Sequence, residues 1–341
     1  MKFATVHGPT VWLCMLAAAL ALAAVPVLAQ APDGAPPGGH AETAVAEPVS
    51  AGVPGRDEGA WPWWAWSLIL FGFCFVVGIL AVVAGVGGGV LYVPLVAGFF
   101  PFHIDFVRAT GLLIALGGAL AAGPGLLKAR LAHLRLALPC ALMASLGGVA
   151  GAVVGLRMDP AALQVALGAC VLAVVLVMAL ARNVEFPEVS RSDRLAMGLG
   201  LGGVYFEESL SRDIVWRVRR TPLGLALFVV VGFIAGMFGL GAGWASVPVL
   251  NLVMGVPLKL AAGSSVFMIS INSSAAAWVY LNNGCWLPVM AVPSILGLML
   301  GTSLGVRLLG RSRPRRVRYV IIAVMVFAGV RSLLRGLGVW V

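Results

Sequence analysis

Ten long apolar segments dominate this sequence and constrain its fold more than any other feature. Most of them are near the roughly 20 residues that cross about 30 Å of hydrocarbon as a helix. With 61% hydrophobic and 11% charged residues, the chain is too apolar for water-soluble domains, which leave about a quarter of their extended-chain surface exposed. We therefore expect an all-α polytopic membrane protein. The segments cover about residues 67–84, 86–100, 106–127, 134–156, 160–181, 222–238, 241–254, 260–281, 286–309 and 317–338.

The residues before the first apolar segment predict a signal and an external arm. Residues 1–29 carry Lys2, an apolar run and Val27-Leu28-Ala29, which fits a cleaved signal peptide; an uncleaved first helix is the alternative. Residues 30–60 are rich in Pro, Gly and Ala without an apolar period, which predicts a disordered arm. The tryptophans that follow favour the membrane interface, namely Trp61, Trp63, Trp64 and Trp66.

The ten segments form two sets of five, within residues 61–181 and 222–341, that are copies at an offset of about 154 residues. Gly85-Val-Gly-Gly-Gly89 matches Gly239-Leu-Gly-Ala-Gly243, and Gly147 falls opposite Gly301. The second member of each set has only some 14 or 15 residues, so it is expected to be a half-helix or a re-entrant segment. A long repeat of this kind predicts a transporter with two halves.

The charges of the connections predict that the two halves face opposite sides of the membrane. Lys128, Arg130 and Arg135 flank the third connection of the first half, whereas its counterpart, residues 282–286, has no charge. In the next connection the order reverses, with one arginine, Arg157, against six in residues 307–318. Because Lys and Arg stay cytoplasmic, ten crossings are expected. An eight-crossing arrangement with paired re-entrant elements is the alternative.

Residues 182–221, between the two sets, are polar and charged. Asp213 to Arg220 alternates apolar with polar residues as a strand does, so we expect a small cytoplasmic insert, with a hairpin as its simplest fold. Gly198, Gly200 and Gly203 have dinucleotide-binding spacing, but no βαβ pattern surrounds them.

The glycine runs are the expected substrate site. A helix broken near its start frees backbone N–H groups and presents the positive end of its dipole, which favours an anion. Close helix packing through small residues is the alternative reading. Hydroxyls and an amide at the third segments add polar candidates, although Ser and Thr often bond back to their own helix. The substrate-binding candidates are Gly87, Gly88, Gly89, Thr110, Gly241, Ala242, Gly243, Ser264, Ser265 and Asn272. Arg108 and Lys259 could attract an anion, or could snorkel to the interface.

Several classes of function are disfavoured. No Asp or Glu lies inside an expected span, which argues against a carboxylate proton relay, and no metal, nucleophile or P-loop motif occurs. We expect no enzyme, no cofactor and no metal. The basic residues behind the net charge of +10 lie between apolar stretches, as in loops that orient membrane helices. We therefore expect lipid and a small anion as partners, and no nucleic acid. Whether the chain forms a homo-oligomer stays open. A thiol relay through Cys74, Cys140 or Cys170, or a sensor acting through the insert, are the rival functions.

The paired glycine motifs, each followed by Val-Pro, and the Ala109-Thr-Gly and Ala262-Gly-Ser-Ser starts resemble the sulfite exporter TauE/SafE family over about residues 66–338, apart from the insert. This resemblance implies a permease of the inner (plasma) membrane for sulfite, organosulfonates such as sulfoacetate, or related anions. Export is the favoured direction, because an inside-negative potential drives a monoanion outward by about 2.3 kcal/mol per 100 mV.

Overall fold

The computed structural model describes residues 63–84, 88–100, 102–128, 131–180, 187, 189, 192–207, 212–309 and 314–338. The signal peptide and external arm expected over residues 1–60 lie outside this part of the chain. Each of the ten apolar segments is helical. The first set gives α2 (Trp63–Ala84), α3 (Gly88–Phe99), α4 (Ile104–Lys128), α5 (Leu134–Arg157) and α6 (Pro160–Leu180). The second gives α8 (Thr221–Phe238), α9 (Gly243–Pro248) continued by the π-helical turn η1 (Val249–Val253), α10 (Leu258–Asn282), α11 (Pro288–Leu309) and α12 (Pro314–Gly336).

Helix length and apolarity separate two kinds of element. Within the described residues, seven helices are long and apolar enough to cross a membrane: α2, α4, α5, α6, α8, α10 and α11. The second members, α3 and α9 with η1, are the shorter apolar helices. Helices suit this environment because each satisfies its own backbone hydrogen bonds where lipid offers no partner. The fold is therefore an all-α polytopic membrane protein.

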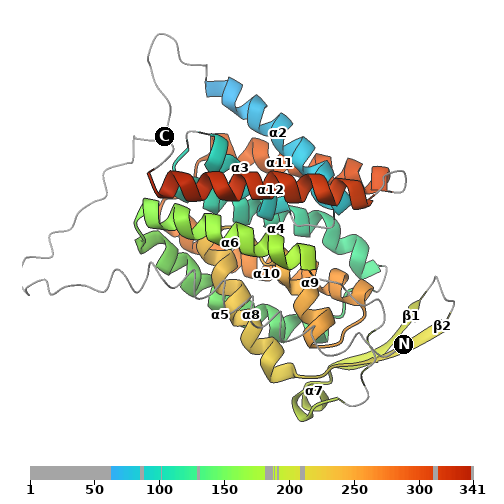
Figure 1. Ribbon diagram of the computed structural model, residues 1–341. Helices are drawn as coiled ribbons and strands as arrows, with labels where there is room; N and C mark the ends of the chain where they lie inside the picture. The colour runs from blue at the N-terminus through green and yellow to red at the C-terminus, as the bar shows by residue number, and fades with distance from the viewer. Residues whose placement is uncertain are drawn as a thin grey trace, which may run out of the picture.

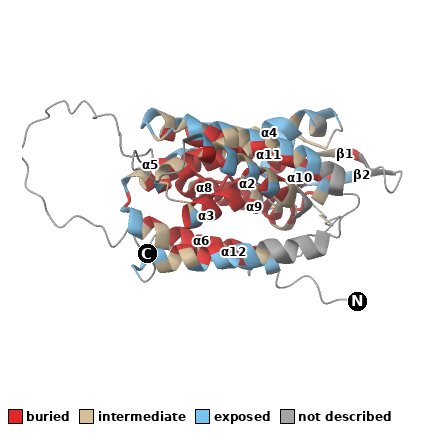
Figure 2. Ribbon diagram, turned by 90° about the horizontal axis from the view of Figure 1, so that it is seen from above, coloured by how far each residue is buried: buried red, intermediate tan, exposed pale blue. Residues whose placement is uncertain are grey.

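The helices pack in pairs that join the two sets. α2 packs against α11, α8 against α5, α6 against α12, and α4 against α10. Figure 1 shows α6 and α12 lying side by side along one face. Figure 2 shows the buried residues concentrated on the central helices, among them α3, which is buried from Gly89 to Gly98. The short helices therefore form the middle of the bundle, and the long ones surround them.

Glycines at four-residue spacing allow the closest of these contacts. Gly147 and Gly151 on α5 face Gly232 and Gly236 on α8, and a Cβ on any of the four would overlap a backbone carbonyl oxygen of the partner helix. The pair of α11 and α2 has the same kind of contact, because a Cβ on Gly297 or Gly301 of α11 would overlap a backbone carbonyl oxygen of α2. Small residues at this spacing let membrane helices approach closely, since packing drives their association in lipid.

The segment between the sets contains α7 (Arg194–Gly198) and a hairpin of β1 (Gly202–Glu207) and β2 (Arg212–Arg217). The strands are antiparallel, and Val204 pairs with Val215. The strand expected over 213–220 ends at Arg217, because Val218 to Arg220 lead into α8. Figure 1 shows the hairpin projecting from one end of the bundle. It contacts the bundle through Trp216, whose ring lies edge-on to His133 at 5.0 Å.

Candidate functional site

The two glycine motifs interrupt helices at neighbouring places. α8 ends at Phe238, the chain passes through Gly239 and Gly241 with φ of 72° and 69°, and α9 begins at Gly243. These left-handed conformations favour glycine because it has no Cβ. In the first half α2 ends at Ala84 and α3 begins at Gly88; residues 85–87, Gly87 among them, are outside the described part.

The start of α3 contacts the second break directly. A Cβ on Gly89 would lie 2.9 Å from the carbonyl oxygen of Leu240 and 3.0 Å from that of Gly111 on α4. Gly111 in turn is packed against the carbonyl of Gly239. Because side chains at these positions would separate the backbones, the glycines hold the two interrupted helices together inside the bundle.

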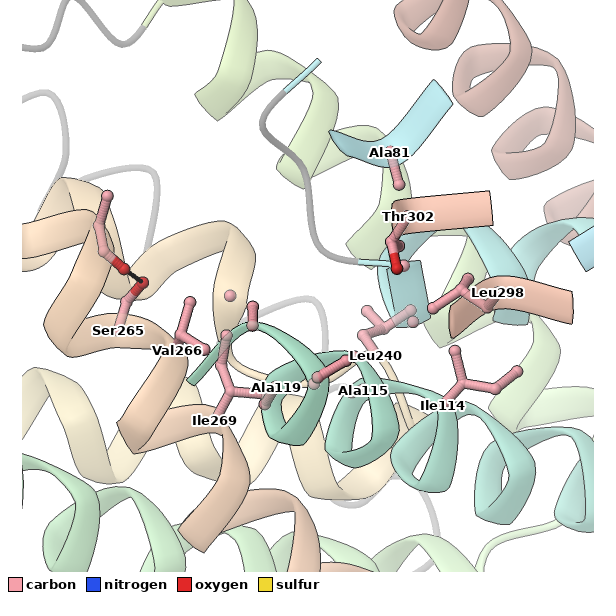
Figure 3. Close-up of a pocket in the computed structure, with 18 of the residues that line it drawn as sticks. Ala81, Ile114, Ala115, Ala119, Leu240, Ser265, Val266, Ile269, Leu298 and Thr302 are labelled. Carbon is pink, nitrogen blue, oxygen red and sulfur yellow. Dashed lines mark hydrogen bonds between the residues drawn. The ribbon is translucent and has the colours of Figure 1, made fainter. Parts of the chain in front are cut away.

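A cavity of about 320 Å³ lies beside this junction. Figure 3 shows its walls: Ile114, Ala115 and Ala119 of α4 lie between Ser265, Val266 and Ile269 of α10 on one side and Leu298 and Thr302 of α11 on the other. The junction contributes Gly88, Gly89, Leu240, Gly241 and Gly243. The remaining lining residues are Ala81, Gly118, Ala121, Ala122, Val247, Ala262 and Ser303.

The cavity wall is mostly apolar, and no described lining residue carries a charge. Its hydroxyls donate to their own helices: Ser265 to the carbonyl of Ala262 at 2.7 Å, and Thr302 and Ser303 to that of Met299 at 2.9 Å. The start of α3, at Gly88 and Gly89, forms part of the same wall.

The structure brings five of the sequence candidates to the cavity wall, namely Gly88, Gly89, Gly241, Gly243 and Ser265. Four others lie behind it. Thr110 is buried within α4, and the Ala242 carbonyl accepts the Ser246 hydroxyl at 2.7 Å. The Ser264 hydroxyl accepts the backbone N–H of His133 at 3.1 Å, so it binds the α4–α5 connection.

The fourth residue behind the wall, Asn272, is fully buried in the middle of α10. Neither its amide nitrogen nor its amide oxygen has a hydrogen-bond partner among the described residues. The oxygen faces α5, where a Cβ on Gly148 would lie 2.5 Å from it. An unsatisfied buried amide is costly, so this position calls for an explanation beyond packing.

The two basic candidates differ sharply. Arg108 is fully buried and does not snorkel: it pairs with Asp105 and donates to the carbonyls of Met237 at 2.8 Å and Gly155 at 3.3 Å. Its guanidinium lies 5.3 Å from the ring centre of Tyr280. It therefore ties α4 to the ends of α5, α8 and α10. Lys259 is exposed at the start of α10.

Sequence reasoning missed several polar residues near the cavity. Thr302 and Ser303 follow Gly301 in an apolar segment, and two hydroxyls in such a segment could have marked them as candidates for the site. Ser273, one of the third-segment hydroxyls that the sequence does offer as a weaker candidate, is buried with an unpartnered hydroxyl within the described part of the chain. Outside the spans, partial burial lowers the pKa of His133 below its usual range, and the positive charge of Arg135 lowers it further. The described cysteines, Cys74, Cys140, Cys170 and Cys285, are all free thiols.

Paired apolar helices, two of them interrupted by glycine beside an internal cavity, define a membrane transporter built on a helical bundle. The family model described as Sulfite exporter TauE/SafE matches residues 68–332, and the chain belongs to that family. It is thus a multi-pass protein of the plasma membrane.

A curated relative points to the same class of protein. The "Probable membrane transporter protein YunE" of Bacillus subtilis (strain 168) is 27% identical over 120 residues. That alignment covers 35% of this chain and 43% of the relative, so the chain matches less than half of the relative's length. No solved structure matches this chain.

Proposed function

We propose that this transporter exports a small sulfur-containing anion, sulfite or an organosulfonate, through two inverted five-helix repeats that make ten crossings. The observation that carries the proposal is the junction of the two glycine breaks at the wall of an internal cavity. The family supplies the sulfur chemistry of the substrate. An outward gradient of the anion and an inside-negative potential, worth about 2.3 kcal/mol per charge per 100 mV, both favour export.

The exchange of helix pairs supports a two-fold relation between the halves. The first helix of one half packs on the fourth helix of the other in both directions, as α2 on α11 and α8 on α5. The third helices, α4 and α10, pack on each other, and so do the fifth, α6 and α12. A two-fold axis through the bundle produces this pattern, and the opposed charges of the connections favour an axis in the membrane plane.

The position of the chain after each short helix supports the view that α3, and α9 with η1, cross the membrane and are not surface loops. The Phe100 ring, after α3, lies 6.2 Å from that of Trp66, near the start of α2, and 5.6 Å from that of Phe73, in the middle of α2. After η1, the Met254 side chain packs on Gly224, near the start of α8. Each short helix therefore runs back along most of the helix before it.

A cavity-filling substitution tests the site. Ala119→Trp places an indole in the cavity, whereas Leu120→Trp, one residue on, changes a side chain that is 59% exposed on the outside of α4. Efflux of labelled sulfite or sulfoacetate from loaded vesicles should be lost in Ala119→Trp and retained in Leu120→Trp, with both variants monodisperse in detergent. Normal efflux from Ala119→Trp would show that the anion does not use this cavity.

A further inference from the structure

The cavity occupies only one half of the interface between α4 and α10. Its walls come from the second half of α4, with Ala119 and Ala122, and from the first half of α10, with Ala262 and Ser265. Ala122 and Ala262 are exposed, so the cavity opens at the end of the bundle where α4 finishes and α10 begins. The exposed side chains of Lys128 and Lys259 lie at this end, which we call the basic end.

The other half of the same interface is closed by a compact apolar cluster, which we call the seal. Its members are almost wholly buried and come from α4, α5 and α10: Ala109, Leu112, Ala152, Ala276, Ala277 and Tyr280. Arg108, fully buried over the Tyr280 ring and paired with Asp105, lies at the end of the seal away from the basic end.

Two unsatisfied polar side chains lie between the cavity and the seal. Ser265 and Ile269 of α10 line the cavity, and helical periodicity places Asn272 and Ser273 next along the same face. Both are fully buried without hydrogen-bond partners in the described part of the chain. A Cβ on Gly241, in the second break, would lie 4.0 Å from the Ser273 hydroxyl oxygen. Unpaired polar groups within a membrane bundle are costly, and they are found where a polar solute or ion passes.

The repeat relates the closed region to the open cavity. The ends of α4 and α10 lie 154 residues apart, and at this offset Ala122 in the cavity wall corresponds to Ala276 in the seal, and Val266 corresponds to Leu112. Thr302, which lines the cavity, corresponds to Gly148, which faces Asn272. The closed region is thus built from the same positions as the cavity, contributed by the opposite halves of the chain.

We propose that the region containing Asn272, Ser273 and the seal is the second half of the translocation path, open when the cavity is closed. In that state the Asn272 amide and the Ser273 hydroxyl donate hydrogen bonds to the anion, and the Arg108–Asp105 pair borders the exit. The inference rests on the proposed function for the anion and on the inverted repeat for the alternation. Movement of the α2–α11 pair against the α5–α8 pair, with the glycine contacts inside each pair kept closed, would exchange the two half-paths.

Cysteine labelling tests the second half-path without requiring a known substrate. In a Cys285→Ser background, Ala122→Cys should react with a membrane-impermeant maleimide only from the basic end. Ala276→Cys should react only from the opposite face, slowly in empty vesicles and faster during sulfite efflux. Asn282→Cys, exposed at the end of α10, is the always-reactive control for that face.

The labelling has outcomes that would overturn the inference. If Ala276→Cys transports but stays unlabelled from the Asn282 face under both conditions, or labels from the basic end, the seal is not a gate. Leu112→Cys, from the facing helix, carries the same test if Ala276→Cys does not fold. Absence of sulfite and sulfoacetate efflux from the unmodified protein would instead contradict the proposed function, while the labelling in empty vesicles would still decide the half-path.

Substitution of the polar pair separates a binding role from a structural one. Asn272→Leu removes unpaired polar groups at similar volume, so the melting temperature should hold or rise while transport falls about 10- to 100-fold. Asn251→Leu is the matched control: the Asn251 amide donates to the carbonyl of Val256 at 2.9 Å, so its loss should lower the melting temperature. A lower melting temperature in Asn272→Leu, or unchanged transport, would rule out the binding role.

Discussion

At the residue scale, glycine acts in two distinct ways in this protein. Gly147, Gly151, Gly232 and Gly236 are ordinary helical residues whose missing side chains bring α5 and α8 together. Gly239 and Gly241 instead adopt left-handed backbone conformations that end one helix before the next begins. The sequence presents both as glycine in apolar surroundings, so only their backbone conformations and neighbours separate packing from helix breaking.

A pair of glycine-to-alanine substitutions tests the packing role. Gly232→Ala would overlap the carbonyl of Ala144 and force α8 away from α5, which should cost about 1–3 kcal/mol of stability as overpacking. Gly72→Ala, on α2, has open space around the new methyl group and should be neutral or slightly stabilising, because Ala favours helix more than Gly. Melting temperatures in detergent measure both; equal values would contradict the close contact.

At the element scale, the break between α8 and α9 holds the start of α4 in place. The Arg108 backbone packs against Gly239, and the Arg108 side chain donates to the carbonyl of Met237 in the last turn of α8. The Tyr280 hydroxyl also donates to this turn, to the carbonyl of Gly236 at 2.9 Å. These bonds satisfy carbonyls that the end of a helix leaves free.

A second glycine pair tests whether this break is built around α4. Gly239 and Gly284 both have left-handed φ, of 72° and 71°, so alanine strains either by about 1–2 kcal/mol. Only Gly239→Ala adds a collision with the Arg108 backbone, whereas Gly284 has open surroundings. We expect Gly239→Ala to lose more thermal stability and transport than Gly284→Ala. Similar losses for the two variants would mean that backbone strain alone matters.

At the scale of the whole molecule, the pairing of helices between halves makes each half dependent on the other. α5 has its main partner in α8, and α11 has its main partner in α2, so neither half contains its own packed bundle. A structure of this kind can change shape by moving one set of helices against the other, while the paired glycine contacts stay closed.

The side of the membrane from which each connection can be labelled tests the inverted arrangement of the two halves. A cysteine in the α4–α5 connection, such as Arg130→Cys, should be labelled from the cytoplasm, whereas Asn283→Cys in the α10–α11 connection should be labelled from outside. The charges of these connections are the basis of the expectation, because basic residues stay cytoplasmic. Labelling of both cysteines from the same face would show that the halves are parallel and would remove the two-fold argument.

The extent of each helix could be predicted from the sequence because apolar length and turn residues are local. All ten expected segments are helices, and the glycine motifs mark where α2 and α8 end. Only part of the candidate cavity wall could be predicted. Gly88, Gly241 and Ser265 line the cavity, but Asn272 lies beyond its wall, further along the same face of α10, because the helices packed around α10 decide how far the cavity extends along it.

By itself, the sequence determined that this chain is a bundle of membrane helices, because a backbone in lipid must satisfy its own hydrogen bonds and the long apolar segments are visible in the residue order. The tertiary structure alone decided which polar groups meet. The burial of Arg108 against the ends of α8 and α10, and the isolation of Asn272 opposite Gly148, arise from contacts between segments more than 100 residues apart. No local pattern encodes such contacts; they follow from how closely glycine lets the helices approach.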